Sequence, residues 1–205
     1  MVSANLVADA VPFRPSTLRS VSGPTRLRLA DLLHITDRTA DDVLSGRYDH
    51  LVPPGGVPTD DRWFARLHGD DEVDVWLISW VPGHRTELHD HGGSLGALTL
   101  LSGSLDEFRW DGEKLRCRRL VAGDQAAFPL GWVHDVVWAP AGPGPSVTSS
   151  AVPSVSETLG PETQGPSLSV HAYSPPLTVM SYYEVADQNR LRRKRTELTD
   201  QPETL

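Results

Sequence analysis

The chain has 205 residues, with 19 Lys or Arg against 27 Asp or Glu, and a formal net charge of −8 at pH 7. This length fits one ordinary globular domain, and 39% hydrophobic with 22% charged residues excludes wholesale disorder and a fibrous repeat. The acidic balance argues against nucleic acid as a partner, because phosphate binding depends on clustered lysine and arginine.

Cysteine content and hydropathy narrow the class of protein further. The single cysteine, Cys117, excludes an internal disulfide and a thiolate zinc cage, so a metal would need histidine or carboxylate ligands. No run approaches the roughly 20 apolar residues of a membrane-spanning helix, and residues 1–20 lack a secretory signal pattern. We therefore expect a soluble, cytoplasmic monomer without a membrane partner.

In chain order, an irregular arm over residues 1–26 is followed by two short helical patterns at 27–35 and 39–46. From residue 62 the pattern changes to short apolar or alternating runs separated by Gly, Pro and Asp, which is typical of an all-β barrel. The predicted strands are 62–68, 73–81, 94–101, 104–110, 114–121, 125–128, 133–138, 168–174 and 178–185.

Two segments depart from this pattern. Residues 141–168 contain 15 Pro, Gly or Ser in 28 positions and are interpreted as an insertion loop within a domain spanning 27–187. Residues 188–205 are interpreted as a basic and then polar C-terminal tail, because Arg and Lys fill most of positions 190–195.

The first motif with chemical content runs from Gly83 to Gly103 and contains His89 and His91. Residues two apart in a strand project from the same face, so these two imidazoles aim into one space as a chelating pair. A His-x-His pattern alone is a weak signal, and a surface or hydrogen-bonding role stays open for it.

A second motif supplies a third imidazole, His134, which follows Gly123, Pro129 and Gly131 at fixed spacing. Together the two blocks resemble the two-part cupin signature, which implies an all-β fold: a single cupin barrel (double-stranded β-helix or jelly roll) with short N-terminal helices. Gly96 stands where most cupins have a glutamate ligand. The ligands are then three neutral imidazoles, which leave about three positions of an octahedral metal open and favour an anionic substrate such as a thiolate.

A third motif places Ser169, His171 and Tyr173 on one face of a predicted strand. Such an alternation can form a hydrogen-bonded relay that orients the phenol toward a reacting centre. A polar edge of the barrel interior is the alternative interpretation.

These three motifs together resemble the cysteine dioxygenase family, the thiol dioxygenase branch of the cupins, over residues 62–185. The resemblance implies Fe(II) held by three histidines, a Ser-His-Tyr triad that acts in catalysis, an arginine that binds the substrate carboxylate, and two pocket-wall residues. The three iron-binding histidines correspond to His89, His91 and His134, and the triad corresponds to Ser169, His171 and Tyr173. The arginine corresponds to Arg66, and the pocket-wall residues correspond to Ile78 and Trp80. Animal members have a cysteine at the Gly96 position that is cross-linked to the tyrosine, and glycine cannot form that bond, so we expect an unmodified Tyr173.

The implied activity is oxidation of the thiol of L-cysteine by O2 to cysteine sulfinic acid. One alternative is a dioxygenase of another small thiol such as 3-mercaptopropionate. Relatives selective for that thiol have a neutral amide at the Arg66 position, although Arg62 or Arg85 could replace the arginine contact. Another alternative is a cupin that binds metal without turnover, or a ligand sensor.

Overall fold

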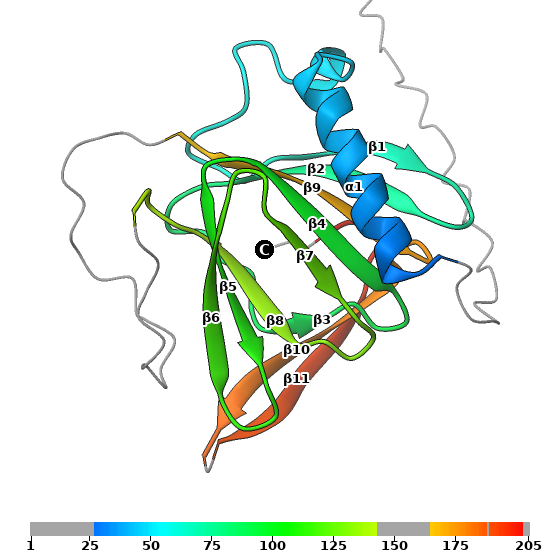
Figure 1. Ribbon diagram of the computed structural model, residues 1–205. Helices are drawn as coiled ribbons and strands as arrows, with labels where there is room; N and C mark the ends of the chain where they lie inside the picture. The colour runs from blue at the N-terminus through cyan, green and yellow to red at the C-terminus, as the bar shows by residue number, and fades with distance from the viewer. Residues whose placement is uncertain (1–26, 143–164, 188, 203–205) are drawn as a thin grey trace, which may run out of the picture.

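The computed structural model describes residues 27–142, 165–187 and 189–202, so the predicted N-terminal arm and most of the predicted insertion lie outside it. In the described residues, strands dominate and form two antiparallel sheets, with one α-helix on the outside (Figure 1). The elements are α1 (Leu29–Leu44), the 3-10 helix η1 (Asp49–Leu51), β1 (Phe64–Gly69), β2 (Asp74–Trp80), β3 (His89–Asp90), β4 (Leu95–Ser102), β5 (Ser104–Trp110), β6 (Leu115–Val121), β7 (Gln125–Phe128), β8 (His134–Trp138), β9 (Ser167–Ser174), β10 (Val179–Ala186) and β11 (Arg190–Leu198).

The two sheets have the strand orders β1-β2-β9-β4-β7 and β11-β10-β3-β8-β5-β6. Inward side chains from both sheets form one core cluster that includes Trp80, Phe128 and Tyr173. Strands that are distant in sequence, such as β2, β9 and β4, are neighbours in one sheet, as a double-stranded β-helix requires. The predicted single cupin barrel is therefore confirmed.

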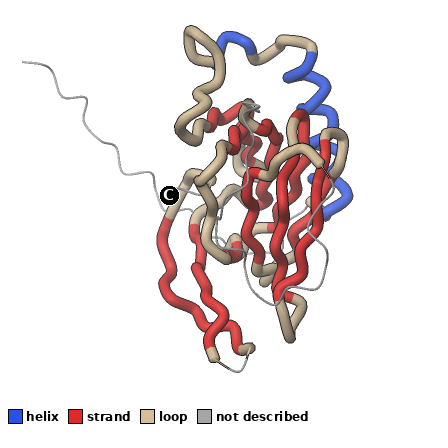
Figure 2. The backbone as a smooth tube through the Cα atoms, turned by 90° about the vertical axis from the view of Figure 1, so that its left-hand side faces the viewer, coloured by secondary structure: helices blue, strands red, loops and turns tan. Residues whose placement is uncertain are grey.

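The N-terminal helix is one element where two short helices were expected. Its inner face carries the buried residues Leu32, Thr36 and Ala40, whose spacing of four continues through the expected break. This stripe packs on β4, β9 and β7 of the five-stranded sheet, and Figure 2 shows the helix along the outside of the strands. No helix in the described residues is long and apolar enough to cross a membrane.

All nine predicted strands are present, each within two residues of its expected bounds. β9 begins at Ser167, so the last two residues of the expected insertion belong to the barrel. Two strands were not predicted: the two-residue β3 and the nine-residue β11.

The expected C-terminal tail was wrong over residues Arg190–Leu198, which form β11 at the edge of the six-stranded sheet. The cause is charge compensation along the β10–β11 hairpin. Arg192 pairs with Glu184, and both Lys194 and Arg195 pair with Glu87 beside β3. An edge strand that displays many charges resists pairing with other chains, so the basic run is compatible with a strand.

Candidate active site

The three predicted metal ligands come together inside the barrel. His89 begins β3 and is the register partner of His134, which begins β8, while His91 directly follows β3. One ring nitrogen from each residue lies within 4.8 Å of the others. The exposed fractions of the three side chains are 0%, 4% and 0% in chain order. No Asp, Glu or Cys joins this cluster in the described part of the chain.

Backbone geometry fixes the ring of His89. Its Nδ1–H donates to the carbonyl oxygen of Glu87 at 2.7 Å, which places the proton on Nδ1 and leaves the Nε2 lone pair for a metal. Three neutral imidazoles within reach of one point are a suitable donor set for a divalent transition metal. The residues therefore fit the metal that the resemblance implies, with His89, His91 and His134 as the ligands that would hold it.

A buried carboxylate supports the third ligand. Glu107 Oε1 on β5 lies 3.4 Å from His134 Nδ1, and its Oε2 accepts a hydrogen bond of 2.6 Å from Arg118 Nε on β6. Burial raises the pKa of the Glu107 carboxyl, but His134 and Arg118 outweigh this effect and bring the pKa to about 2. A fixed negative charge at Nδ1 orients the ring and leaves Nε2 for a metal. Sequence reasoning missed Glu107.

A second carboxylate lies between the two histidines of the first motif. Asp90 Oδ2 accepts a hydrogen bond of 2.6 Å from the Tyr183 hydroxyl on β10, and Oδ1 accepts one of 2.9 Å from the Gly92 amide. Arg193 on β11 donates to the same Tyr183 oxygen at 3.0 Å. The last two strands thus hold the loop that positions His89 and His91.

The three residues of the predicted relay are connected in order. His171 Nε2 lies 3.0 Å from Ser169 Oγ, and His171 Nδ1 lies 3.2 Å from the Tyr173 hydroxyl. The Trp80 indole N–H donates to Ser169 Oγ at 2.8 Å. The Tyr173 ring stands against His91, with 4.8 Å between ring centres. The relay therefore begins at Trp80 and ends beside the histidine cluster.

Gly96 leaves room for the Tyr173 ring. The two residues are register partners in β4 and β9, and a Cβ at Gly96 would meet the Tyr173 ring at 3.3 Å and the Phe128 ring at 2.9 Å. A carboxylate ligand is absent at this position, as the sequence indicated, and the space is occupied by aromatic side chains.

The predicted substrate-binding side chains take different positions. Ile78 and Trp80 are buried in the barrel core, whereas Arg66 is exposed, with its guanidinium 5.5 Å from the Trp76 ring centre. Arg62 was named only as a substitute, but its guanidinium lies 4.1 Å from the centre of the Trp80 ring. The structure therefore places Arg62 on Trp80, at the start of the relay, and Arg66 near Trp76, the register partner of His171.

One comparison with known proteins bears on part of this site. Residues 59–128 match the family model described as cysteine dioxygenase type I, a segment that includes His89 and His91. The match confirms the resemblance to the cysteine dioxygenase family. This match and the three-histidine cluster are both consistent with a cysteine dioxygenase-type cupin. Both are also consistent with a metal cofactor. No curated protein matches the sequence.

Solved structures with a similar arrangement include a conserved protein with a double-stranded β-helix domain from Klebsiella pneumoniae. It is 17% identical, with a TM-score of 0.42, and the match covers 72% of this chain and 93% of that chain. An RmlC-like cupin from Shewanella frigidimarina is 16% identical, with a TM-score of 0.39 and coverage of 56% and 76%.

Proposed function

We propose that the protein is a thiol dioxygenase that oxidises L-cysteine with O2 to cysteine sulfinic acid at an Fe(II) centre held by His89, His91 and His134. One observation carries the proposal: a buried, all-imidazole cluster stands directly against the tyrosine of a Ser-His-Tyr relay. A cupin that only stores metal does not need such a relay, so the relay favours an enzyme over a sensor.

Charge explains the preference for a thiol. Bound Fe(II) would supply open coordination positions for the substrate and for O2, the chemistry that non-haem iron oxygenases use. Three neutral ligands leave the positive charge of the ion uncompensated by protein, so the metal site favours an anionic sulfur donor. Burial of all three rings keeps bulk water away from that charge.

The relay has a proton arrangement that serves this chemistry. An indole N–H can only donate, so Ser169 accepts from Trp80 and can donate its own proton to His171 Nε2. A neutral His171 then carries its proton on Nδ1 and donates to the Tyr173 oxygen. The Tyr173 hydroxyl proton is left to donate toward the substrate or O2 beside His91.

The substrate carboxylate needs a cation, and we assign that role to Arg62 in place of Arg66. A guanidinium can bind a carboxylate through two hydrogen bonds, which fixes the orientation of the thiolate. The stacking of Arg62 on Trp80 holds the cation next to the relay. Arg62→Gln should raise KM for L-cysteine at least tenfold, whereas Arg66→Gln should change this KM less than threefold. A larger increase in Arg66→Gln than in Arg62→Gln would show that Arg66 binds the substrate carboxylate.

The deciding experiment for the activity is anaerobic loading with Fe(II), followed by O2 uptake with L-cysteine and with 3-mercaptopropionate. We expect cysteine-dependent uptake, one O2 per sulfinate formed, and the higher kcat/KM for cysteine. A higher kcat/KM for 3-mercaptopropionate would assign the enzyme to that thiol. Iron binding without uptake on either thiol would leave a metal-binding cupin and refute the proposed activity.

Tyr173→Phe tests the relay separately. The substitution removes only the hydroxyl, so turnover should fall by about 10²-fold or more while iron content stays near that of the wild type. Tyr48→Phe is the matched control, because Tyr48 lies outside the barrel near η1. Loss of iron in Tyr173→Phe would instead indicate a structural role for the hydroxyl.

A further inference from the structure

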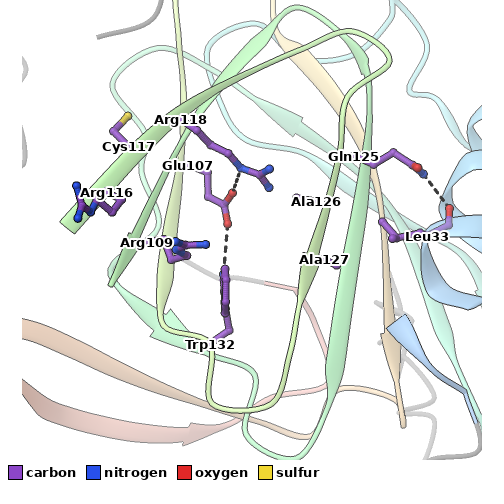
Figure 3. A pocket seen from close by; sticks show the side chains of 10 residues that line it. All are labelled: Leu33, Glu107, Arg109, Arg116, Cys117, Arg118, Gln125, Ala126, Ala127 and Trp132. Carbon is purple, nitrogen blue, oxygen red and sulfur yellow. Dashed lines mark hydrogen bonds and ion pairs between the residues drawn. The ribbon is translucent and has the colours of Figure 1, made fainter. Parts of the chain in front are cut away.

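A cavity of about 430 Å³ opens at the seam of the barrel, where edge strand β7 of one sheet faces edge strand β6 of the other (Figure 3). Its floor is Glu107, the carboxylate beside His134. None of the three histidines lines the cavity, so Glu107 separates it from the candidate metal centre.

Three arginines line one side of this cavity: Arg109 on β5, and Arg116 and Arg118 on β6. Arg109 and Arg116 are register partners in the hairpin, and like charges directly opposite each other in a ladder are destabilising. Although the protein has a net charge of −8, three arginine side chains line the same cavity. A ligand of opposite charge would remove this repulsion.

The local charges indicate the charge of the ligand. Arg116 pairs with Asp111, and Arg118 pairs with Glu107. No carboxylate in the described residues pairs with Arg109, whose guanidinium instead lies 4.5 Å from the Trp132 ring centre. Three cations and two carboxylates leave one positive charge uncompensated, which a monoanion matches and a doubly charged phosphate exceeds.

The remaining walls of the cavity indicate the chemistry of the part of the ligand that carries no charge. Trp132 and Leu33 provide apolar surface, and Ala126 and Ala127 on β7 contribute only small side chains to the lining (Figure 3). A guanidinium beside an aromatic ring suits a planar carboxylate that can bind the fork and lie along the ring.

We propose that this seam cavity is a second binding site, for a small monocarboxylate with a planar or apolar body. Arg109 and Arg116 bind the carboxylate, and Trp132 and Leu33 contact the apolar part. The proposal does not rest on the proposed dioxygenase activity, because none of these four residues belongs to the histidine cluster or the relay.

The test is a titration of the full-length chain with benzoate, followed by ¹H–¹⁵N NMR. The Trp132 indole signal, assigned by its loss in Trp132→Phe, reports on the cavity because that N–H points toward Glu107. We expect saturable shifts of this signal, and an affinity that falls about tenfold or more in Arg109→Gln. Arg190→Gln, an exposed arginine on β11, makes the same change in net charge and should bind normally.

Three results would overturn the proposal: no saturable shift in the wild type, equal weakening in Arg109→Gln and Arg190→Gln, or inorganic phosphate binding as tightly as benzoate. A melting curve shows whether Arg109→Gln is folded. If it is not, Arg116→Gln carries the test, with a smaller expected loss because Asp111 already neutralises part of its charge.

Discussion

At the residue scale, Glu107 links the protein's electrostatics to its candidate metal. The carboxylate is 2% exposed, and it contacts a ligand histidine on one side and an arginine on the other. A buried negative charge at Nδ1 of His134 makes that imidazole a stronger donor toward a metal. The low pKa of Glu107, about 2, keeps this charge in place across the physiological pH range.

Glu107→Gln should therefore weaken metal binding by about 10- to 100-fold, because the amide keeps the shape of the side chain and loses its charge. Competition between the protein and a chelator for Co(II) measures the effect without any turnover. Glu113→Gln, in the exposed β5–β6 turn, is the control. An unchanged Co(II) affinity in Glu107→Gln would show that the carboxylate serves its contacts with Arg118 and Trp132 and not the metal ligand.

Gly96 gives a second prediction at this scale. Gly96→Ala places a methyl group 2.9 Å from the Phe128 ring and 3.3 Å from the Tyr173 ring, so the aromatic packing must shift. Overpacking of this kind costs about 1–3 kcal/mol of unfolding free energy, measurable by urea denaturation. Gly93→Ala is a matched control, because nothing lies within 4 Å of its Cβ position. Equal stability of the two variants contradicts the prediction.

At the element scale, β10 and β11, the last two strands at one end of the six-stranded sheet, hold the first ligand loop. Tyr183 on β10 donates to Asp90, and Arg193 on β11 donates to Tyr183, so the loop between His89 and His91 is anchored by two strands. Figure 2 shows this hairpin on the opposite side of the molecule from α1. The C-terminal strand is thus part of the support of the site.

Tyr183→Phe removes a 2.6 Å hydrogen bond to a buried carboxylate and should lower the free energy of unfolding by about 1–3 kcal/mol. Tyr48→Phe should be within about 0.5 kcal/mol of the wild type, since Tyr48 makes no side-chain hydrogen bond to the described residues. Urea denaturation of both variants and the wild type measures these changes in the free energy of unfolding. A loss below 0.5 kcal/mol in Tyr183→Phe would mean that Asp90 is held adequately by Gly92.

The same elements show what could be predicted from the sequence. β7 has one buried face and alternates clearly, and the expected bounds of both β5 and β7 match the observed ones. β11 lacks that signal, because its partners Glu87 and Glu184 lie on other segments and neutralise its charges only in the fold. Glu107 was missed for the same reason. Its alternation with Leu105 marks it as inward-facing, but its partners His134 and Arg118 come from neighbouring strands.

At the scale of the whole molecule, the barrel buries ionisable groups whose charge affects stability. Asp74, the register partner of Tyr173, is 1% exposed. Burial raises its pKa from 3.8 to about 6, while Trp76 and Arg66 partly oppose the shift. The folded protein therefore binds this proton more tightly than the unfolded chain does. The contribution of Asp74 to stability is favourable at low pH and declines as the pH rises through about 6.

Asp74→Asn removes this dependence. Relative to the wild type, the variant should gain about 2 kcal/mol of unfolding free energy on going from pH 4.5 to pH 7.5, because only the wild type must keep a buried carboxylate ionised at the higher pH. Urea denaturation of the metal-free variant and wild type at the two pH values measures this difference in unfolding free energy. Both proteins contain the same histidines, so the contributions of histidine titration cancel in the difference. Asp60→Asn, at an exposed loop position, should show the same offset from the wild type at both pH values. An equally pH-independent offset for Asp74→Asn would mean that Arg66 and Trp76 compensate the burial fully, and that Asp74 is ionised throughout this range.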